Sequence, residues 1–169
     1  MELILQQGLP HQQKAIDAVC AALEGVTIAP PVQFYENPQI DLRDRRLLAN
    51  LRDLQKAVPA EYRSSIPIGT CLNLDIKMET GTGKTYVYTK TIYELHKRYG
   101  INKFIIAVPS LAIKAGTAQF IQDEYARRHF TDSCGYGTEV ELGVLEAPKN
   151  KKKGRSYFPS VVSDFVKGS

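Results

Sequence analysis

The first third of the chain contains two stretches whose apolar residues recur at the three-to-four-residue spacing of an α-helix. One follows Pro10 and stops at Gly25. Its apolar face consists of Ile16, Val19, Cys20 and Leu23. The other begins at Asp41, a residue type that caps helix N-termini, and ends before Pro59. Residues 26–40 contain three prolines, and they indicate a connector between the two helices.

Strand-like patterns begin after residue 67. Residues 72–78 alternate apolar and polar side chains, which is the two-residue period of a β-strand. Residues 103–108 form a continuous apolar run, and such a run suits a strand that is buried on both faces of a parallel sheet. Residues 140–145 are a third candidate strand. We therefore expect the second part of the chain to contain a sheet.

Helices are predicted between and after these strands, over residues 84–99, 111–128 and 161–166. The alternation of strand and helix favours an α/β fold of three layers with a mostly parallel sheet. The change of pattern divides the chain into two expected parts. Residues 1–65 form an N-terminal helical segment with its connector, and residues 66–169 form the α/β part.

The composition is that of a soluble globular protein. The chain has 169 residues, about the size of one domain, of which 43% are apolar and 24% are charged. No apolar run approaches the roughly 18–20 residues of a membrane-spanning helix, and the first residues lack the basic start of a secretory signal. The three cysteines form no CxxC pair, which argues against a disulfide framework or a zinc site. We expect a cytoplasmic protein with no membrane partner.

The net charge of +4 is concentrated in one place. Five positive charges and no negative ones lie between Lys149 and Arg155, so the rest of the chain is nearly neutral. A general electrostatic footprint for nucleic acid is therefore absent. The local basic loop has two interpretations: a solvated hairpin, or a non-specific and salt-sensitive contact with a phosphate backbone.

A glycine-rich segment, METGTGKT, joins the first predicted strand to the helix that follows it. Gly81 and Gly83 allow a tight turn in which successive backbone N–H groups point at phosphate oxygens, and the helix offers its positive N-terminus to the same anion. Lys84 is placed to reach the β- and γ-phosphates, and the Thr85 hydroxyl is placed to ligate Mg²⁺. The predicted phosphate-binding residues are Thr80, Gly81, Thr82, Gly83, Lys84 and Thr85.

The segment departs from the strict GxxxxGK[ST] pattern, because Met78 stands where the leading glycine would be. A glycine-rich turn with an accidental Lys-Thr pair is the competing interpretation. The flanking strand and helix are the context that the phosphate-binding motif requires. The motif therefore predicts nucleotide phosphate binding.

Without its leading glycine, TGTGKT resembles the first motif of superfamily 2 helicases and translocases. More narrowly, METGTGKTYVY resembles the Res subunit of type III restriction enzymes, which are DNA-dependent ATPases and endonucleases. This resemblance implies a RecA-like P-loop NTPase domain that binds ATP and Mg²⁺, with Lys84 as its catalytic cation. It also implies that double-stranded DNA and a modification (methyltransferase) subunit are partners of the parent protein.

Two further stretches support the resemblance. HQQKAI, at residues 11–16, is similar to the upstream glutamine motif of such motors. The similarity implies that Gln12 reads adenine, and a carboxamide can both donate to and accept from an adenine edge. FIIAVPS is similar to motif Ia, which implies that Pro109 and Ser110 approach the DNA backbone. The alternatives are an exposed glutamine at a helix start and an ordinary strand–helix connection.

The acidic box with which such a motor holds Mg²⁺ and orients water is not evident. Asp123 and Glu124 fall inside a predicted helix, where an ordinary helix surface is the better interpretation. Two motor lobes of domain size do not fit into 169 residues, and no nuclease-like segment is evident. We therefore expect an incomplete first motor domain from the N-terminal part of a longer protein. It is expected to bind Mg·ATP weakly, with hydrolysis near background.

Three other functions stay open at this point. The first alternative is a different superfamily 2 DNA or RNA helicase, which Glu79 and the YVY continuation disfavour. A nuclease domain after the motor would distinguish the two. A small P-loop phosphotransferase is a second alternative, against which Met78 and the Gln12 segment speak. The third is a stand-alone nucleotide-binding module without turnover.

Overall fold

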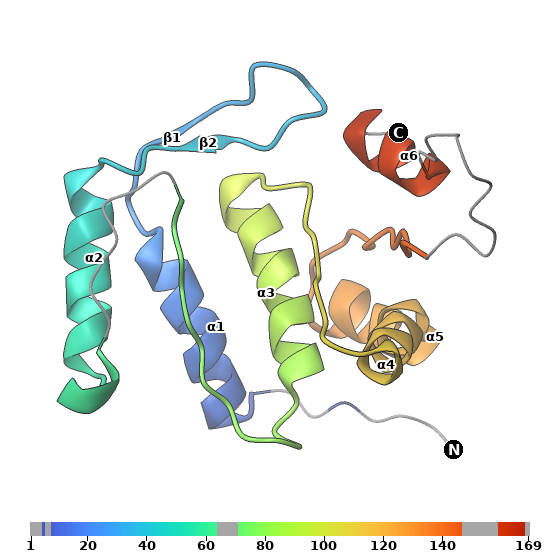
Figure 1. The fold of residues 1–169 in the computed structure, drawn as a ribbon, viewed down its shortest axis with the longest axis horizontal. Helices are drawn as coiled ribbons and strands as arrows, with labels where there is room; N and C mark the ends of the chain where they lie inside the picture. The colour runs from blue at the N-terminus through green and yellow to red at the C-terminus, as the bar shows by residue number, and fades with distance from the viewer. Residues whose placement is uncertain (1–4, 6–7, 64–70, 147–158, 168–169) are drawn as a thin grey trace, which may run out of the picture. The chain divides into compact units, whose positions relative to one another are not determined.

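The computed structural model describes residues 5, 8–63, 71–146 and 159–167 (Figure 1). Two compact units make up the chain. The first, the α1–α3 unit, lies within residues 4–30 and 38–101, and the second, the α4–α6 unit, lies within residues 31–37 and 102–169. The division into residues 1–65 and 66–169 stays a prediction.

Three helices dominate the first unit. They are α1 (Pro10–Ala22), α2 (Arg45–Lys56) and α3 (Lys84–Tyr99). A short antiparallel pair, β1 (Ile28–Ala29) and β2 (Gln39–Ile40), precedes α2, and a 3-10 turn, η1 (Ala60–Tyr62), follows it. In Figure 1, α1 lies between α2 and α3. The helices expected after Pro10 and over residues 84–99 are confirmed.

The start of α2 differs from the prediction. Asp44, not Asp41, is the N-cap residue, and its carboxylate accepts a hydrogen bond of 2.7 Å from the Arg46 N–H. It also accepts one of 2.7 Å from the Thr27 N–H. These bonds, that from Thr27 foremost, hold the pKa of Asp44 below its usual value. Asp41 instead accepts from the Arg43 N–H in the turn before the helix. The cap forms at Asp44 because that carboxylate serves both the helix and the neighbouring segment.

Two apolar clusters form the core of the α1–α3 unit, and both include residues of α1. The cluster toward α2 contains Ala22, Leu23, Val26, Leu47 and Leu51. The cluster toward α3 contains Ala15, Ile16, Cys20 and Val87. Ile16 and Leu47 are 1% and 2% exposed, so α1 is fixed on both sides by well-buried contacts.

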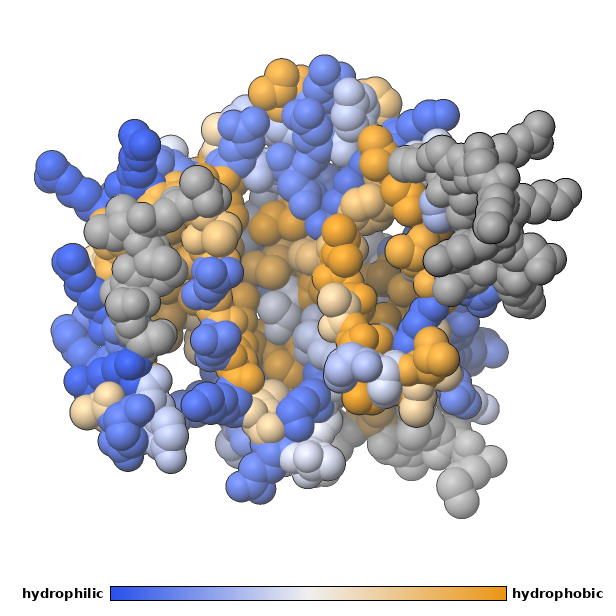
Figure 2. Space-filling view, in the orientation of Figure 1, coloured by the Kyte–Doolittle hydropathy of each residue, from blue (hydrophilic) through white to orange (hydrophobic). Residues whose placement is uncertain are grey.

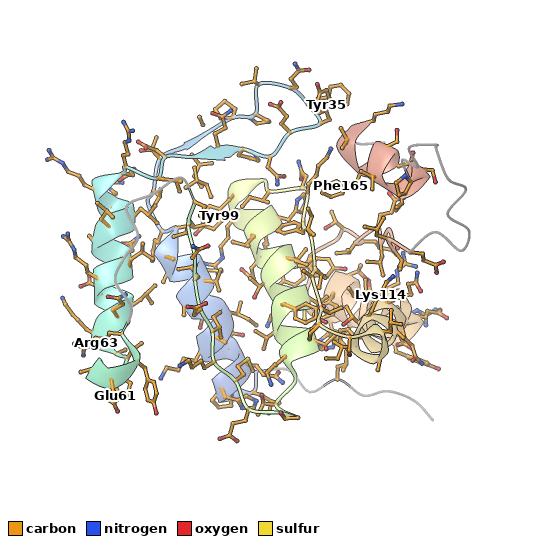
Figure 3. All side chains as sticks on the ribbon, in the orientation of Figure 1. Tyr35, Glu61, Arg63, Tyr99, Lys114 and Phe165 are labelled. Atoms are coloured by element: carbon orange, nitrogen blue, oxygen red, sulfur yellow. The ribbon has the colours of Figure 1, made fainter. Side chains whose placement is uncertain are left out.

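The end of α1 is tied down by side chains from the other two helices. The Asn50 amide donates to the Ala22 and Glu24 carbonyls at 3.2 and 2.9 Å. The Tyr99 hydroxyl donates to the Cys20 carbonyl at 2.8 Å (Figure 3). The Ala22 carbonyl is one of the last in the helix, which have no partner within it, so the bond from Asn50 satisfies it.

The second unit contains α4 (Leu111–Gln122), α5 (Glu124–Arg128), a π-helical turn (His129–Ser133) and α6 (Ser160–Lys167). The single helix predicted over residues 111–128 is therefore interrupted. Asp123 adopts an extended backbone conformation, and its carboxylate accepts from the Ala126 N–H at 3.0 Å. The interruption follows because Asp123 acts as a new N-cap, which competes with continuing the helix. The short helix expected near residues 161–166 is confirmed.

Asn37 connects residues 31–37 to the start of the segment 102–169 within the second unit. Its amide donates to the Lys103 carbonyl at 2.8 Å and accepts from the N–H groups of Asn102 and Lys103. The Lys103 ammonium lies 5.7 Å from the Tyr35 ring and 5.4 Å from the Phe165 ring, both labelled in Figure 3. One lysine therefore connects the connector segment to α6.

The mostly parallel sheet is not confirmed. Residues 72–78, 103–108 and 140–145 have no strand assignment, and β1 and β2 are the strands in the described part of the chain. The expectation that residues 103–108 are buried on both faces is wrong, because Ile105 is 83% exposed. A strand needs a partner for its ladder of hydrogen bonds and a cover for each apolar face, and an apolar run in the sequence specifies neither. Figure 2 shows hydrophobic residues at the surface, among hydrophilic ones, on the face that it draws.

Leu47→Ala is expected to lower the free energy of unfolding by about 2–5 kcal/mol, because it removes a buried side chain and leaves a cavity between α1 and α2. Leu74→Ala is the matched control, since Leu74 is 36% exposed in the same unit. The control is expected to cost less than about 1 kcal/mol. Urea denaturation measures both. Equal losses would contradict the placement of Leu47 in the core.

Candidate phosphate-binding site

The glycine-rich loop, residues 79–83, leads directly into α3. Gly81 and Gly83 have φ angles of +82° and +85°, in the left-handed region that residues with a Cβ atom rarely adopt. Gly83 is also the N-cap residue of α3. The loop therefore needs glycine at both positions to bring the chain into the helix.

No side chain caps the N-terminus of α3. The start of α1 likewise has no capping side chain. By contrast, side chains cap α2, α4 and α5, namely those of Asp44, Ser110 and Asp123. The first N–H groups of a helix have no partner within the helix and carry partial positive charge. An anion at the start of α3 would therefore meet backbone donors with no capping side chain to displace.

The first turn of α1 contacts the loop. The side-chain amide of Gln12 donates to the Thr82 carbonyl at 3.0 Å, and Nε2 of His11 lies 3.1 Å from the same oxygen. Gln12 is 7% exposed, and its Oε1 atom is buried with no hydrogen-bond partner among the described residues. The structure thus brings Gln12 together with the predicted phosphate-binding residues, through the loop backbone.

Lys84 folds back over the loop. Its ammonium donates to the Glu79 carbonyl at 2.6 Å, and the Thr82 hydroxyl donates to the same carbonyl at 2.7 Å. Lys84 and Thr80 are exposed, and Thr85 is half-buried in the first turn of α3. The ammonium is therefore held at the loop by one accessible hydrogen bond, from which a flexible lysine side chain can move to a bound anion.

Met78 has a packing role that explains the missing leading glycine. Its half-buried side chain packs against the cluster of Ala15, Ile16, Cys20 and Val87, between α1 and α3. A glycine at this position would leave that contact unmade. Met78 thus packs under the start of the loop and leaves Gly81 and Gly83 unchanged.

Pro109 and Ser110 belong to the second unit, and both are exposed. The Ser110 hydroxyl caps α4 by accepting from the Ile113 N–H at 3.3 Å. Lys114, labelled in Figure 3, donates to the Leu145 carbonyl. Ser110 and Lys114 thus have structural partners of their own at the start of α4. The basic loop between Lys149 and Arg155 lies outside the described residues.

Within the described ranges, no three His, Cys, Asp or Glu side chains group as metal ligands. Asp123 caps α5, and Glu124 pairs with Arg128 on its surface. Their interpretation as structural residues, not as the acidic box of a motor, agrees with these contacts.

Comparison with known proteins places these features in a family. Residues 6–158 match the family described as "Type III restriction enzyme, res subunit". The chain belongs to this family. It is 38% identical over 97% of its length to the EcoPI Res subunit of Escherichia phage P1, and 38% identical over 98% to the EcoP15I Res subunit of Escherichia coli. The StyLTI Res subunit of Salmonella typhimurium is 39% identical over 98% of the chain.

The chain spans about a sixth of these relatives' length, 17%, 17% and 14% respectively. Membership in the family implies a RecA-like helicase fold. Searching the described residues for a helix long and apolar enough to cross a membrane gives none.

His11 is the residue at this site that sequence reasoning missed. The pattern around residues 11–16 indicated Gln12, but as a partner of adenine. His11 and Gln12 contact Thr82, which lies 71 and 70 residues further along the chain. A pattern of local spacing therefore cannot predict this contact. The adjacent His and Gln at a helix start were the available signal.

Gly83→Ala is expected to destabilise the chain more than Gly81→Ala. A Cβ atom at residue 83 would overlap Nε2 of Gln12, whereas one at residue 81 would meet nothing within 4 Å. Both changes carry the cost of a left-handed conformation, about 1–2 kcal/mol, and Gly83→Ala adds about 1–3 kcal/mol of overpacking. Thermal and urea unfolding measure the difference.

The Gln12→Ala change tests the cause. Combined with Gly83→Ala, it is expected to recover part of the loss, because it removes the atom that the new Cβ would strike. Combined with Gly81→Ala, it should recover nothing. Strict additivity in both double variants would show that Gln12 does not lie against Gly83.

Proposed function

We propose that the chain binds Mg·ATP at the loop of residues 80–85 and forms part of the ATP-dependent DNA motor of a type III restriction enzyme. The observation that carries this proposal is the uncapped start of α3, behind two left-handed glycines and beside Lys84. Membership in the Res subunit family supports it.

The backbone supplies the phosphate contacts in this proposal. The N–H groups of Gly83, Lys84 and Thr85 open α3, and together they provide donors and the positive end of the helix dipole. The Lys84 ammonium leaves the Glu79 carbonyl and contacts the β- and γ-phosphates. It balances negative charge on these oxygens during transfer, which is its catalytic role.

Thr85 is the residue that would hold Mg²⁺. A hydroxyl oxygen is a suitable ligand, and Mg²⁺ commonly takes its other ligands from phosphate oxygens and water. When bound with ATP, the ion neutralises charge on the phosphates. The absence of a cluster of carboxylates among the described residues is compatible with this arrangement, because the site needs few protein ligands.

Double-stranded DNA and a modification (methyltransferase) subunit are the proposed partners of the complete Res subunit. The names of the matched relatives, restriction-modification enzymes, support this assignment. In the chain itself, Pro109 and Ser110 are the proposed DNA contacts, since both are exposed at the start of α4, where backbone N–H groups gather. Adenine recognition by Gln12 stays a prediction.

A nucleotide-binding module without turnover is the second candidate for the isolated chain. The engagement of Asp123 and Glu124 in structural contacts favours it, because these two residues are then not available to orient water. Phosphate release by the chain is therefore expected to stay near background even where ATP binds.

Lys84→Ala is expected to abolish ATP binding measured by calorimetry, because it removes the cation at the phosphates. Lys97→Ala is the matched control: it removes the same charge from the exposed last turn of α3 and should leave the affinity unchanged. Retained affinity in the Lys84 variant would refute phosphate binding by this loop.

Ser110→Asp separates capping from DNA contact. Aspartate is as good an N-cap as serine, so α4 should keep its stability, while the new negative charge repels a phosphate. We expect weaker binding of double-stranded DNA at low salt, with the difference fading as salt rises. Gln119→Asp is the control, because Gln119 is exposed in the same helix and the change adds the same charge away from its start. Equal effects of both variants would argue against a contact at Ser110.

A further inference from the structure

Two neighbouring side chains of α1 converge on one backbone oxygen of the loop. The Gln12 amide donates to the Thr82 carbonyl at 3.0 Å, and His11 Nε2 lies 3.1 Å from it. A carbonyl oxygen only accepts, so this contact requires the His11 ring to carry its proton on Nε2. Both lone pairs of the Thr82 oxygen are then in use.

The first turn of α1 is a firm support for this pair of contacts. Ile16 and Val87, 1% and 5% exposed, pack α1 against α3. His11 and Gln12 therefore hold the loop against an element that is itself fixed to the helix that follows the loop.

Fixing the Thr82 carbonyl also fixes the direction of the next N–H group. The chain contains no cis peptide bond among its described residues, so the Thr82 C=O and the Gly83 N–H point in opposite directions across one planar unit. With the oxygen held toward α1, the Gly83 N–H points away from α1. That N–H is the first donor of the proposed phosphate site at α3.

The contact is independent of any base. The Gln12 amide meets the Thr82 carbonyl with one N–H of Nε2, and its second N–H and its Oε1 atom take no part in that contact. His11 is exposed and contacts the loop backbone in the same way. Neither residue thus needs the nucleoside to act on the loop.

We propose that His11 is a positioning residue, which with Gln12 orients the Thr82–Gly83 peptide for any triphosphate, whatever its base. This inference rests on the proposed function, since it assigns residues to the same site. It predicts that loss of the His11 donor lowers the affinity for inorganic triphosphate and the affinity for Mg·ATP by the same factor.

The experiment compares His11→Phe, which keeps a ring but has no donor, with His11→Gln, which restores an N–H donor. Calorimetry on the full chain measures the affinity for inorganic triphosphate and for Mg·ATP. His11→Phe should weaken both about 2–10-fold, the usual effect of one hydrogen bond, and His11→Gln should restore most of the loss. Gln13→Ala, in the same turn but without contact to the loop, should change neither.

Three results would overturn the inference: unchanged triphosphate affinity in His11→Phe, a loss confined to Mg·ATP, or an equal loss in Gln13→Ala. A loss confined to Mg·ATP would mean contact with the base. If the unmodified chain bound neither ligand, the proposed function would fail instead. In that case, amide hydrogen exchange of the peptide covering residues 79–85, measured without ligand, still tests whether His11 positions the loop. Exchange should be faster in His11→Phe, and unchanged exchange would refute the positioning role.

Discussion

The packing of α1 against α3 is the contact on which the candidate site depends. Ile16, Cys20 and Val87 bury apolar surface between the two helices, and Met78 extends this cluster under the loop. The loop has few apolar groups of its own, so its conformation derives from the elements on either side. Without that support, a glycine-rich turn would be flexible before binding, and fixing its backbone on an anion would cost the full conformational entropy of its glycines.

The site divides its tasks between backbone and side chains. Left-handed glycines and an uncapped helix supply donors that cannot be replaced by a side chain, whereas Lys84 supplies a charge on a flexible stem. Contacts from α1 lie on the opposite side of the loop backbone, at the Thr82 carbonyl. This division explains why Met78 replaces a glycine without altering the donors, since the strain is confined to Gly81 and Gly83.

The helical elements were largely predictable, and the sheet was not. The bounds of α3 follow from a glycine at each end, and α1 follows from Pro10 and the spacing of its apolar residues. These signals act over a few residues. Residues 72–78 and 103–108 carry strand patterns as clear, yet they are unpaired among the described residues. Pairing is a property of two segments, and Ile105, 83% exposed, shows that apolar character does not imply a cover.

By itself the sequence determined the phosphate-binding chemistry expected of residues 80–85 and the resemblance to Res subunits, because both are written in contiguous residues. It also indicated Gln12 through a short motif. Only the tertiary structure decided where the Gln12 amide lies and that His11 shares its acceptor. It also decided that Asp44 caps α2 in place of Asp41, and that Asp123 caps a separate helix. The reason is distance along the chain. His11 and Thr82 are 71 residues apart. Such contacts form when helix faces are buried against each other, and a local pattern does not specify which faces meet.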